Sequence, residues 1–77
     1  MKIVGVECQF RTDGQLTIQR VQWQGKWQSV EQGRQWSDHE GRHVLVILPG
    51  QSAQELVLGK ETLNWVLRPL GQKVYLA

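Results

Sequence analysis

The sequence has little cysteine, little proline and no long apolar run, and each scarcity excludes a class of protein. Only one of its 77 residues is cysteine, which excludes an internal disulfide. A secreted domain of this size would normally need several disulfides, so we expect a cytosolic protein. The longest apolar run covers residues 44–48, far short of the ~20 residues of a membrane-spanning helix. The first residues also lack the apolar stretch of a signal peptide, so we expect no membrane association.

An excess of one charge is also missing. Nine Lys and Arg residues stand against seven Asp and Glu residues, which gives a net charge of +2, and the basic residues are dispersed. A dedicated nucleic-acid-binding domain usually has a clustered basic face, so the charge alone does not indicate one. The length fits a single domain over residues 1–77 and is too short for a Rossmann unit with its cofactor.

Alternation of apolar and polar residues is the main pattern that is present. It recurs along most of the chain in short stretches, separated by glycine-containing turns. A period of two residues is typical of strands with one buried face, and short connections favour antiparallel pairing. We therefore predict an all-β fold, either a single antiparallel, strongly bent sheet or a small open barrel of six or seven short strands.

The first hairpin can be predicted in register. A loop of residues 12–14 puts Phe10 opposite Leu16 and Cys8 opposite Ile18, so that all four lie on one face. Gly14 then occupies the left-handed position that closes such a loop. Further along the chain, the apolar residues shift from even-numbered positions (Leu16, Ile18) to odd-numbered ones (Val21, Trp23). We therefore predict a bulge near residues 19–20 or a change of packing face.

The remaining strands follow from the same pattern. We predict a third strand at residues 26–32, a polar loop at 36–41, a central strand at 42–49, a strand at 63–68 and a short final strand at 74–76. Residues 52–59 fit either a strand or a short helix with a capping box, and we predict a strand. The eleven glutamines interleave with apolar residues, so we expect them on the solvent-exposed faces of the strands.

One polar segment contains residue types that could perform chemistry. His39 and His43 are four residues apart, with Asp38 and Glu40 beside them. On a helix that spacing would direct both imidazoles at one metal ion, but Gly41 interrupts the segment and zinc needs three or four converging ligands. We therefore predict a solvated loop and no metal.

A catalytic role has no support in the sequence. Residues 37–39 read Ser-Asp-His, but three consecutive residues cannot reproduce the geometry of a hydrolase triad. Cys8 alternates with apolar residues and is predicted to be a small core residue. No glycine-rich phosphate loop is present. We expect no enzymatic activity, no catalytic residue and no cofactor.

Four tryptophans are the most informative feature. Trp65 lies on the apolar side of its predicted strand, whereas the other three are surrounded by polar and basic residues. One interpretation is a stacking surface for nucleobases with cations for phosphates. The other is that large side chains fill a thin core. The candidate binding surface consists of Arg20, Trp23, Lys26, Trp27, Arg34 and Trp36.

A set of short motifs between residues 21 and 68 resembles a known family. The motifs are Trp23-x-Gly25-Lys26, Val30, Trp36, Arg42-His43-x-Leu45-Val46, Glu55-Leu56 and Trp65-x-Leu67-Arg68. They resemble the W-x-G-[KR]…V…W…E-L…W-x-L pattern of an uncharacterised family of small bacterial all-β domains. That pattern is similar to the C-terminal segment of mutagenesis proteins related to Y-family DNA polymerases. The resemblance implies an all-β fold and an association with DNA repair or replication, but no activity. The chain departs from it around the first turn, where Gln and Ser replace residues that are often Arg or aromatic.

Together these observations predict a non-catalytic binding module. We expect a weak, salt-sensitive contact with nucleic acid through Trp23, Trp27, Lys26 and Arg34, as in a DNA-repair-associated accessory domain. The alternative is a domain for protein–protein interaction or self-association that does not bind nucleic acid. A thin core and exposed sheet edges favour a homodimer in that case.

Overall fold

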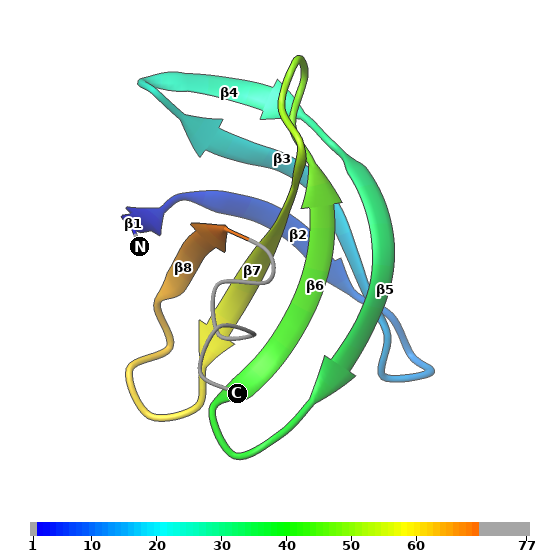
Figure 1. Cartoon of the computed structure of the whole chain (residues 1–77). Helices are drawn as coiled ribbons and strands as arrows, with labels where there is room; N and C mark the ends of the chain where they lie inside the picture. The colour runs from blue at the N-terminus through cyan, green and yellow to red at the C-terminus, as the bar shows by residue number, and fades with distance from the viewer. Residues whose placement is uncertain (1, 70–77) are drawn as a thin grey trace.

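Eight antiparallel strands in two sheets make up residues 2–69, the part of the chain that this computed structural model describes (Figure 1). The strands are β1 (Lys2–Val4), β2 (Val6–Phe10), β3 (Leu16–Trp23), β4 (Lys26–Ser29), β5 (Glu31–Ser37), β6 (Gly41–Ile47), β7 (Ala53–Gly59) and β8 (Trp65–Pro69). The larger sheet has the order β1-β8-β7-β6-β5 and the smaller one the order β2-β3-β4. The all-β prediction is confirmed. The predicted strand at residues 74–76 lies outside the described residues.

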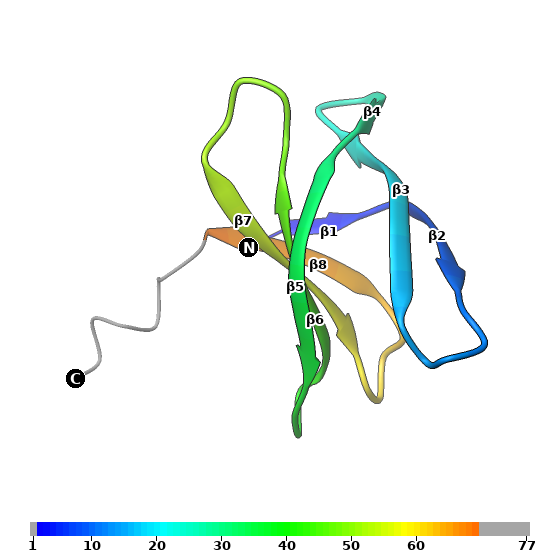
Figure 2. The same cartoon turned by 90° about the vertical axis from the view of Figure 1, so that its right-hand side faces the viewer.

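The number of strands and sheets differs from the prediction of six or seven strands in one sheet. Two segments that the pattern indicated as single strands are each interrupted by one residue, Gly5 between β1 and β2 and Val30 between β4 and β5. On either side of the interruption the strand pairs in a different sheet, so both sheets stay open (Figure 2). At Gly5 the carbonyl accepts a hydrogen bond of 2.8 Å from the Gln22 amide. A Cβ there would lie 3.0 Å from side-chain atoms of Gln22 and Trp27, so the missing side chain allows the bend.

The first hairpin has the predicted register. Cys8 lies opposite Ile18 and Phe10 opposite Leu16, and Gly14 has a φ of 85°. The pairing shifts by one residue between Glu7 and Cys8, which leaves Gln19 as the extra residue of a bulge. Loop chemistry and apolar alternation were therefore sufficient to predict this element.

The secondary-structure predictions for two further segments, residues 52–59 and 36–41, have opposite outcomes. The first segment forms strand β7, as predicted, and β6 is central between β5 and β7. The predicted polar loop at 36–41 is wrong, because β5 continues to Ser37 and β6 begins at Gly41. The strand predicted at residues 63–68 begins only at Trp65, and Leu63, which is 71% exposed with a φ of 59°, lies in the turn before it.

The hydrophobic core lies between the two sheets. Its buried members are Leu16, Ile18, Val21, Val44, Val46, Leu48, Leu56 and Leu67. Trp23 and Trp65 are partly buried and pack against this cluster, as the core-filling interpretation of the tryptophans predicts. Burying each such aliphatic side chain contributes about 1.5–3 kcal/mol, so the core is the main source of stability. No helix occurs among residues 2–69, so that part of the chain offers no helical membrane span.

Two glutamines contradict the expectation that all of them face solvent. Gln32 and Gln35 of β5 lie opposite Val46 and Val44, and their side chains reach the backbone of β3. Gln32 accepts from the Ile18 amide at 2.8 Å, while Gln35 accepts from the Leu16 amide at 2.9 Å. Both side-chain amides also donate to the Leu16 carbonyl. An amide side chain has a donor and an acceptor, so it replaces the missing strand pairing between β3 and β5.

Candidate functional site

A row of outward-facing side chains crosses the five-stranded sheet. The strand register places side by side Trp36, His43, Val57, Val66 and Ile3. They face away from the core because their neighbours along the strands, such as Val44 and Leu56, point into it. A second outward pair, Glu55 on β7 and Arg68 on β8, lies next to this row. This face brings together most of the charged side chains discussed below.

His43 is fully buried on this outward face, although strands usually present their outward residues to water. Its Nδ1 is hydrogen-bonded to the carboxylate of Glu55, and its Nε2 lies 2.7 Å from Oδ1 of Asp38. The indole of Trp36 stacks on the imidazole at 5.0 Å with an interplanar angle of 3°. Both ring nitrogens of His43 therefore face a carboxylate.

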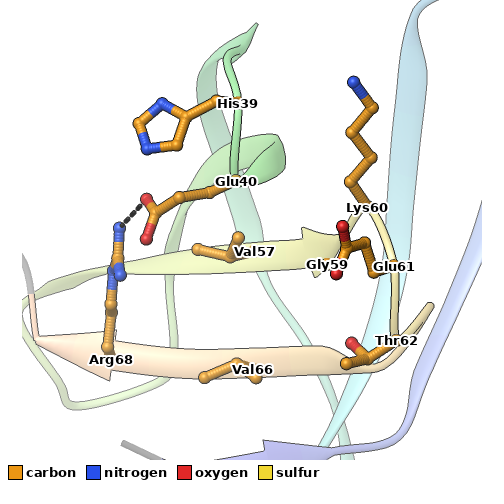
Figure 3. Close-up of a pocket in the computed structure, with 9 residues that line it drawn as sticks. All are labelled: His39, Glu40, Val57, Gly59, Lys60, Glu61, Thr62, Val66 and Arg68. Atoms are coloured by element: carbon orange, nitrogen blue, oxygen red, sulfur yellow. Dashed lines mark hydrogen bonds and ion pairs between the residues drawn. The ribbon is translucent and has the colours of Figure 1, made fainter.

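Arg68 links Glu55 to a third carboxylate, that of Glu40. It donates to Oε1 and Oε2 of Glu55 at 3.3 and 3.2 Å. It also donates to Oε1 of Glu40 at 3.1 Å, the contact drawn in Figure 3. Glu55 is 2% exposed, so these charge-assisted bonds offset the cost of burying its charge. We refer to Asp38, Glu40, His43, Glu55 and Arg68 as the buried charge cluster.

The cluster changes the acidity of its exposed carboxylates. The hydrogen bond from His43, helped by the backbone amides of Glu40 and Gly41, lowers the pKa of Asp38 to about 2. The hydrogen bond from Arg68 lowers the pKa of Glu40. Both carboxylates are therefore ionised over the whole physiological pH range.

A tight turn between β5 and β6 holds two of these carboxylates in place. Asp38 and Gly41 exchange backbone hydrogen bonds of 3.0 and 3.2 Å, and the Glu40 amide donates to the Asp38 side chain at 2.8 Å. The Glu40 carbonyl accepts from the Lys60 amide at 2.9 Å, which docks the turn on the end of β7. Gly41 has a φ of 146°, and a Cβ there would lie only 1.9 Å from the Leu58 carbonyl oxygen. Only glycine therefore fits this close approach.

A pocket of about 390 Å³ opens beside the cluster. Figure 3 shows Val57 and Val66 on the two strands that form its floor, with Glu40 and Arg68 on one side. The remaining lining residues are His39, Gly59, Lys60, Glu61 and Thr62. Lys60 forms no ion pair with any residue from 2 to 69, so its ammonium group is available at the rim. The pocket thus combines an apolar floor with a charged rim.

The structure divides the predicted binding surface between the two sheets. Trp27 and Arg20 lie together on the outward face of the three-stranded sheet, where the guanidinium is 5.8 Å from the ring centroid. Trp27 is 43% exposed, but Glu7 holds Arg20 through two hydrogen bonds of 2.7 and 2.8 Å. This face therefore offers an exposed indole beside a cation whose charge is already paired.

The other four predicted surface residues lie elsewhere. Trp23 packs against the core at the β3–β4 turn, opposite Lys26, and its ring lies 5.3 Å from the Lys2 ammonium group. Trp36 lies on the five-stranded sheet, where the guanidinium of Arg34 is 4.8 Å from its ring. The structure therefore brings the six residues together only as pairs: Arg20 with Trp27, Trp23 with Lys26, and Arg34 with Trp36.

Sequence reasoning missed part of the buried charge cluster. It pointed to Asp38, Glu40 and His43 but predicted a solvated loop, which is wrong because His43 is completely buried. It named Glu55 and Arg68 only within the motifs of the family resemblance and gave them no role in a site. Each of these is a charged residue at an outward position of an otherwise apolar strand, and that was the one available indication. Their meeting depends on cross-strand register, which the alternation pattern does not specify.

Comparison with known proteins adds no identification. The sequence matches no protein-family model, and no curated protein or solved structure is significantly similar to it. The resemblance to small bacterial all-β domains therefore stays a prediction.

Proposed function

We propose that the protein is a non-catalytic module that binds an exposed segment of a partner protein in the pocket over Val57 and Val66. The observation that supports this proposal is the combination of an apolar floor and a charged rim in a pocket of about 390 Å³. Ligand sites are mostly apolar concavities of about 300–1,000 Å³ with a few placed polar groups. The size of this pocket fits one large side chain of a bound segment.

The chemistry of the pocket indicates what the segment contains. An apolar side chain gains free energy by covering the apolar floor, mainly Val66 because Val57 is only 7% exposed, at about 25 cal/mol per Å² of apolar surface removed from water. Lys60 at the rim favours an acidic group next to that side chain, because its own charge has no partner among residues 2–69. Ile3, which is 68% exposed and lies opposite Val66 on β1, extends the apolar surface. The preferred segment is therefore an apolar residue with an adjacent carboxylate.

Single-stranded nucleic acid is the second candidate partner. The observation in its favour is the exposed indole of Trp27 with Arg20 beside it, since bases stack on exposed aromatic rings. The pairing of Arg20 with Glu7 weakens this candidate, because phosphate binding would have to compete with that carboxylate. The formal net charge of +2 adds little electrostatic attraction.

Selection from a random displayed-peptide library tests the proposal. The selected peptides should share an apolar residue beside an acidic one, and in NMR titrations they should shift the amides of Val57, Lys60 and Val66. Lys60→Glu should weaken binding by about fivefold, because reversing a rim charge replaces an attraction by a repulsion. Lys26→Glu is the matched control with the same charge change on the other sheet, and it should bind as the wild type does.

A second pair of variants tests the apolar floor. Val66→Asp should abolish peptide binding, whereas Ile47→Asp places the same charge on the same face of the sheet outside the pocket and should leave binding intact. Thermal melts confirm that both variants are folded. Failure to enrich any peptide, or binding that is insensitive to both pocket variants, would refute the proposal. Quenching of Trp fluorescence by an oligothymidine, together with weaker oligothymidine binding in Lys26→Glu, would instead support nucleic-acid binding.

A further inference from the structure

Three side chains of the β5–β6 hairpin converge in the way that ligands of a metal ion do. One donor atom from each of Asp38, Glu40 and His43 lies within 4.8 Å of the other two. Nε2 of His43 is 2.7 Å from Oδ1 of Asp38 and 3.8 Å from Oε1 of Glu40. Bonds of about 2.0–2.1 Å in a tetrahedron put two zinc ligands about 3.3 Å apart, so each of these two separations would have to change by about 0.5 Å. The two observed distances lie on either side of that value.

A fourth residue supplies a feature that is characteristic of metal-binding histidines. Nδ1 of His43 is hydrogen-bonded to Glu55, which comes from β7, is 2% exposed and is held by Arg68. Metal-ligating histidines almost always donate their second N–H to a carboxylate, a backbone carbonyl or a water, which fixes the ring and raises the basicity of the ligating nitrogen. The hydrogen bond between Nδ1 and Glu55 orients the ring so that Nε2 points toward Asp38 and Glu40. This observation is independent of the three donor atoms, because Glu55 is not one of them.

We propose that Asp38, Glu40 and His43 bind a divalent transition-metal ion such as Zn²⁺, with Glu55 orienting the histidine. Nε2 of His43 lies within hydrogen-bonding distance of Asp38. The ion would take the place of this contact: the nitrogen lone pair coordinates the metal, and a proton carried by that nitrogen leaves to solvent.

Arg68 does not prevent this exchange. It donates to Oε1 of Glu40, and this oxygen has two lone pairs, so it can accept from Arg68 and coordinate a metal ion at the same time. Three protein ligands leave at least one coordination position for water or for a group of a bound molecule. Glu40 also lines the pocket described above, so that position would lie at the pocket wall.

The donor set determines which ions are suitable. One imidazole nitrogen and two carboxylates favour Zn²⁺ and its transition-metal neighbours, whereas Mg²⁺ and Ca²⁺ prefer oxygen ligands alone. We therefore expect Zn²⁺ to bind and millimolar Mg²⁺ to have no effect. This inference is independent of the proposed peptide binding, since Lys60→Glu changes the peptide site and leaves all three ligands in place.

Isothermal titration of the full chain with Zn²⁺ near pH 7 tests the inference. We expect one ion per chain, and repeating the titration in buffers of different ionisation enthalpy measures how many protons are released on binding. Glu40→Gln and Asp38→Asn should each weaken Zn²⁺ binding by about tenfold or more. The matched controls are Glu61→Gln, which makes the same change on the opposite side of the pocket, and His39→Gln, which removes the neighbouring imidazole. Both controls should bind as the wild type does.

NMR of the imidazole nitrogens gives a second readout that does not depend on variants. Zn²⁺ should move the Nε2 resonance of His43 and leave that of His39 unchanged. No binding at millimolar Zn²⁺ would overturn the inference, as would loss of binding in His39→Gln or equal binding in Glu40→Gln and the wild type. His43→Gln is less informative, because the loss of a buried ring would also destabilise the fold.

Discussion

His43 and Glu55 form a buried hydrogen-bonded pair on the outward face of the five-stranded sheet. Trp36 stacks on the histidine from β5, and Arg68 pairs with the glutamate from β8, so neighbouring strands enclose the pair. A buried ion pair contributes little net stability by itself, because desolvation offsets the attraction. Removing one partner, however, leaves the other charge buried and unsatisfied. The pair is therefore more sensitive to substitution than its position on an outer face suggests.

Replacing the carboxylate of this pair tests that argument. Glu55→Ala leaves the charges of His43 and Arg68 without their common acceptor, so we expect a loss of about 3–5 kcal/mol in the free energy of unfolding. Glu61→Ala removes an exposed carboxylate outside the cluster and should cost less than about 0.5 kcal/mol. Urea unfolding monitored by Trp fluorescence measures both. A cost below about 1 kcal/mol for Glu55→Ala would show that the pair is not enclosed as described.

The side-chain bridge between the two sheets leads to a second prediction. Gln32→Leu keeps the size of the side chain but leaves the Ile18 amide without its acceptor, which should cost about 1–3 kcal/mol. Gln19→Leu, at the exposed bulge, is the control and should change stability by less than about 0.5 kcal/mol. Hydrogen exchange of the Ile18 amide should accelerate only in the first variant. Unchanged exchange would mean that Gln32 does not substitute for strand pairing.

Two glycines with positive φ give a matched test of the turn that holds Asp38 and Glu40. Gly41→Ala places a Cβ 1.9 Å from the Leu58 carbonyl oxygen, so the hairpin must move and we expect a cost of about 3 kcal/mol or more. Gly50 also has a positive φ of 71° but has nothing within 4 Å of an added Cβ. Gly50→Ala should therefore cost only the backbone term of about 1–2 kcal/mol. Equal costs, measured by thermal unfolding, would contradict the close approach at Gly41.

Alternation and turn chemistry were sufficient to predict the all-β class and most of the strands, but neither the number of strands nor their division into two sheets. The register of the first hairpin followed from Gly14 and from the apolar face shared by Phe10 and Leu16. The breaks at Gly5 and Val30 could not be predicted, because a strand bends where its pairing partner changes, and partners are set by the whole fold.

The candidate site shows the same limit more clearly. His43 is four residues from His39 in the sequence, yet its contacts are with Glu55 on the next strand and Asp38 in the preceding turn. A polar side chain on the outward face of a sheet is buried only where side chains of neighbouring strands cover it. The alternation pattern does not describe those neighbours and predicts that every outward position is exposed to solvent. Charged residues in apolar strands, such as Glu55, are the feature from which such a cluster could have been inferred.

The acidity of Asp38 gives a pH-dependent prediction. The hydrogen bond from His43 lowers its pKa from 3.8 to about 2 in the folded protein. Between these two values the unfolded chain binds a proton that the folded protein does not bind, so stability rises with pH in this window. The contribution of Asp38 is fully present above pH 3.8 and is lost as the pH falls through about 2.

Asp38→Asn removes this titration and keeps an oxygen that can accept from His43. The free energy of unfolding of the wild type should therefore fall more steeply than that of Asp38→Asn as the pH is lowered from 3.8 to about 2. Urea unfolding at a series of pH values measures the two slopes, and NMR titration of the Asp38 carboxyl carbon measures its midpoint directly. A midpoint near 3.8, or parallel slopes, would mean that the hydrogen bond from His43 does not stabilise the ionised Asp38 carboxylate in the folded protein.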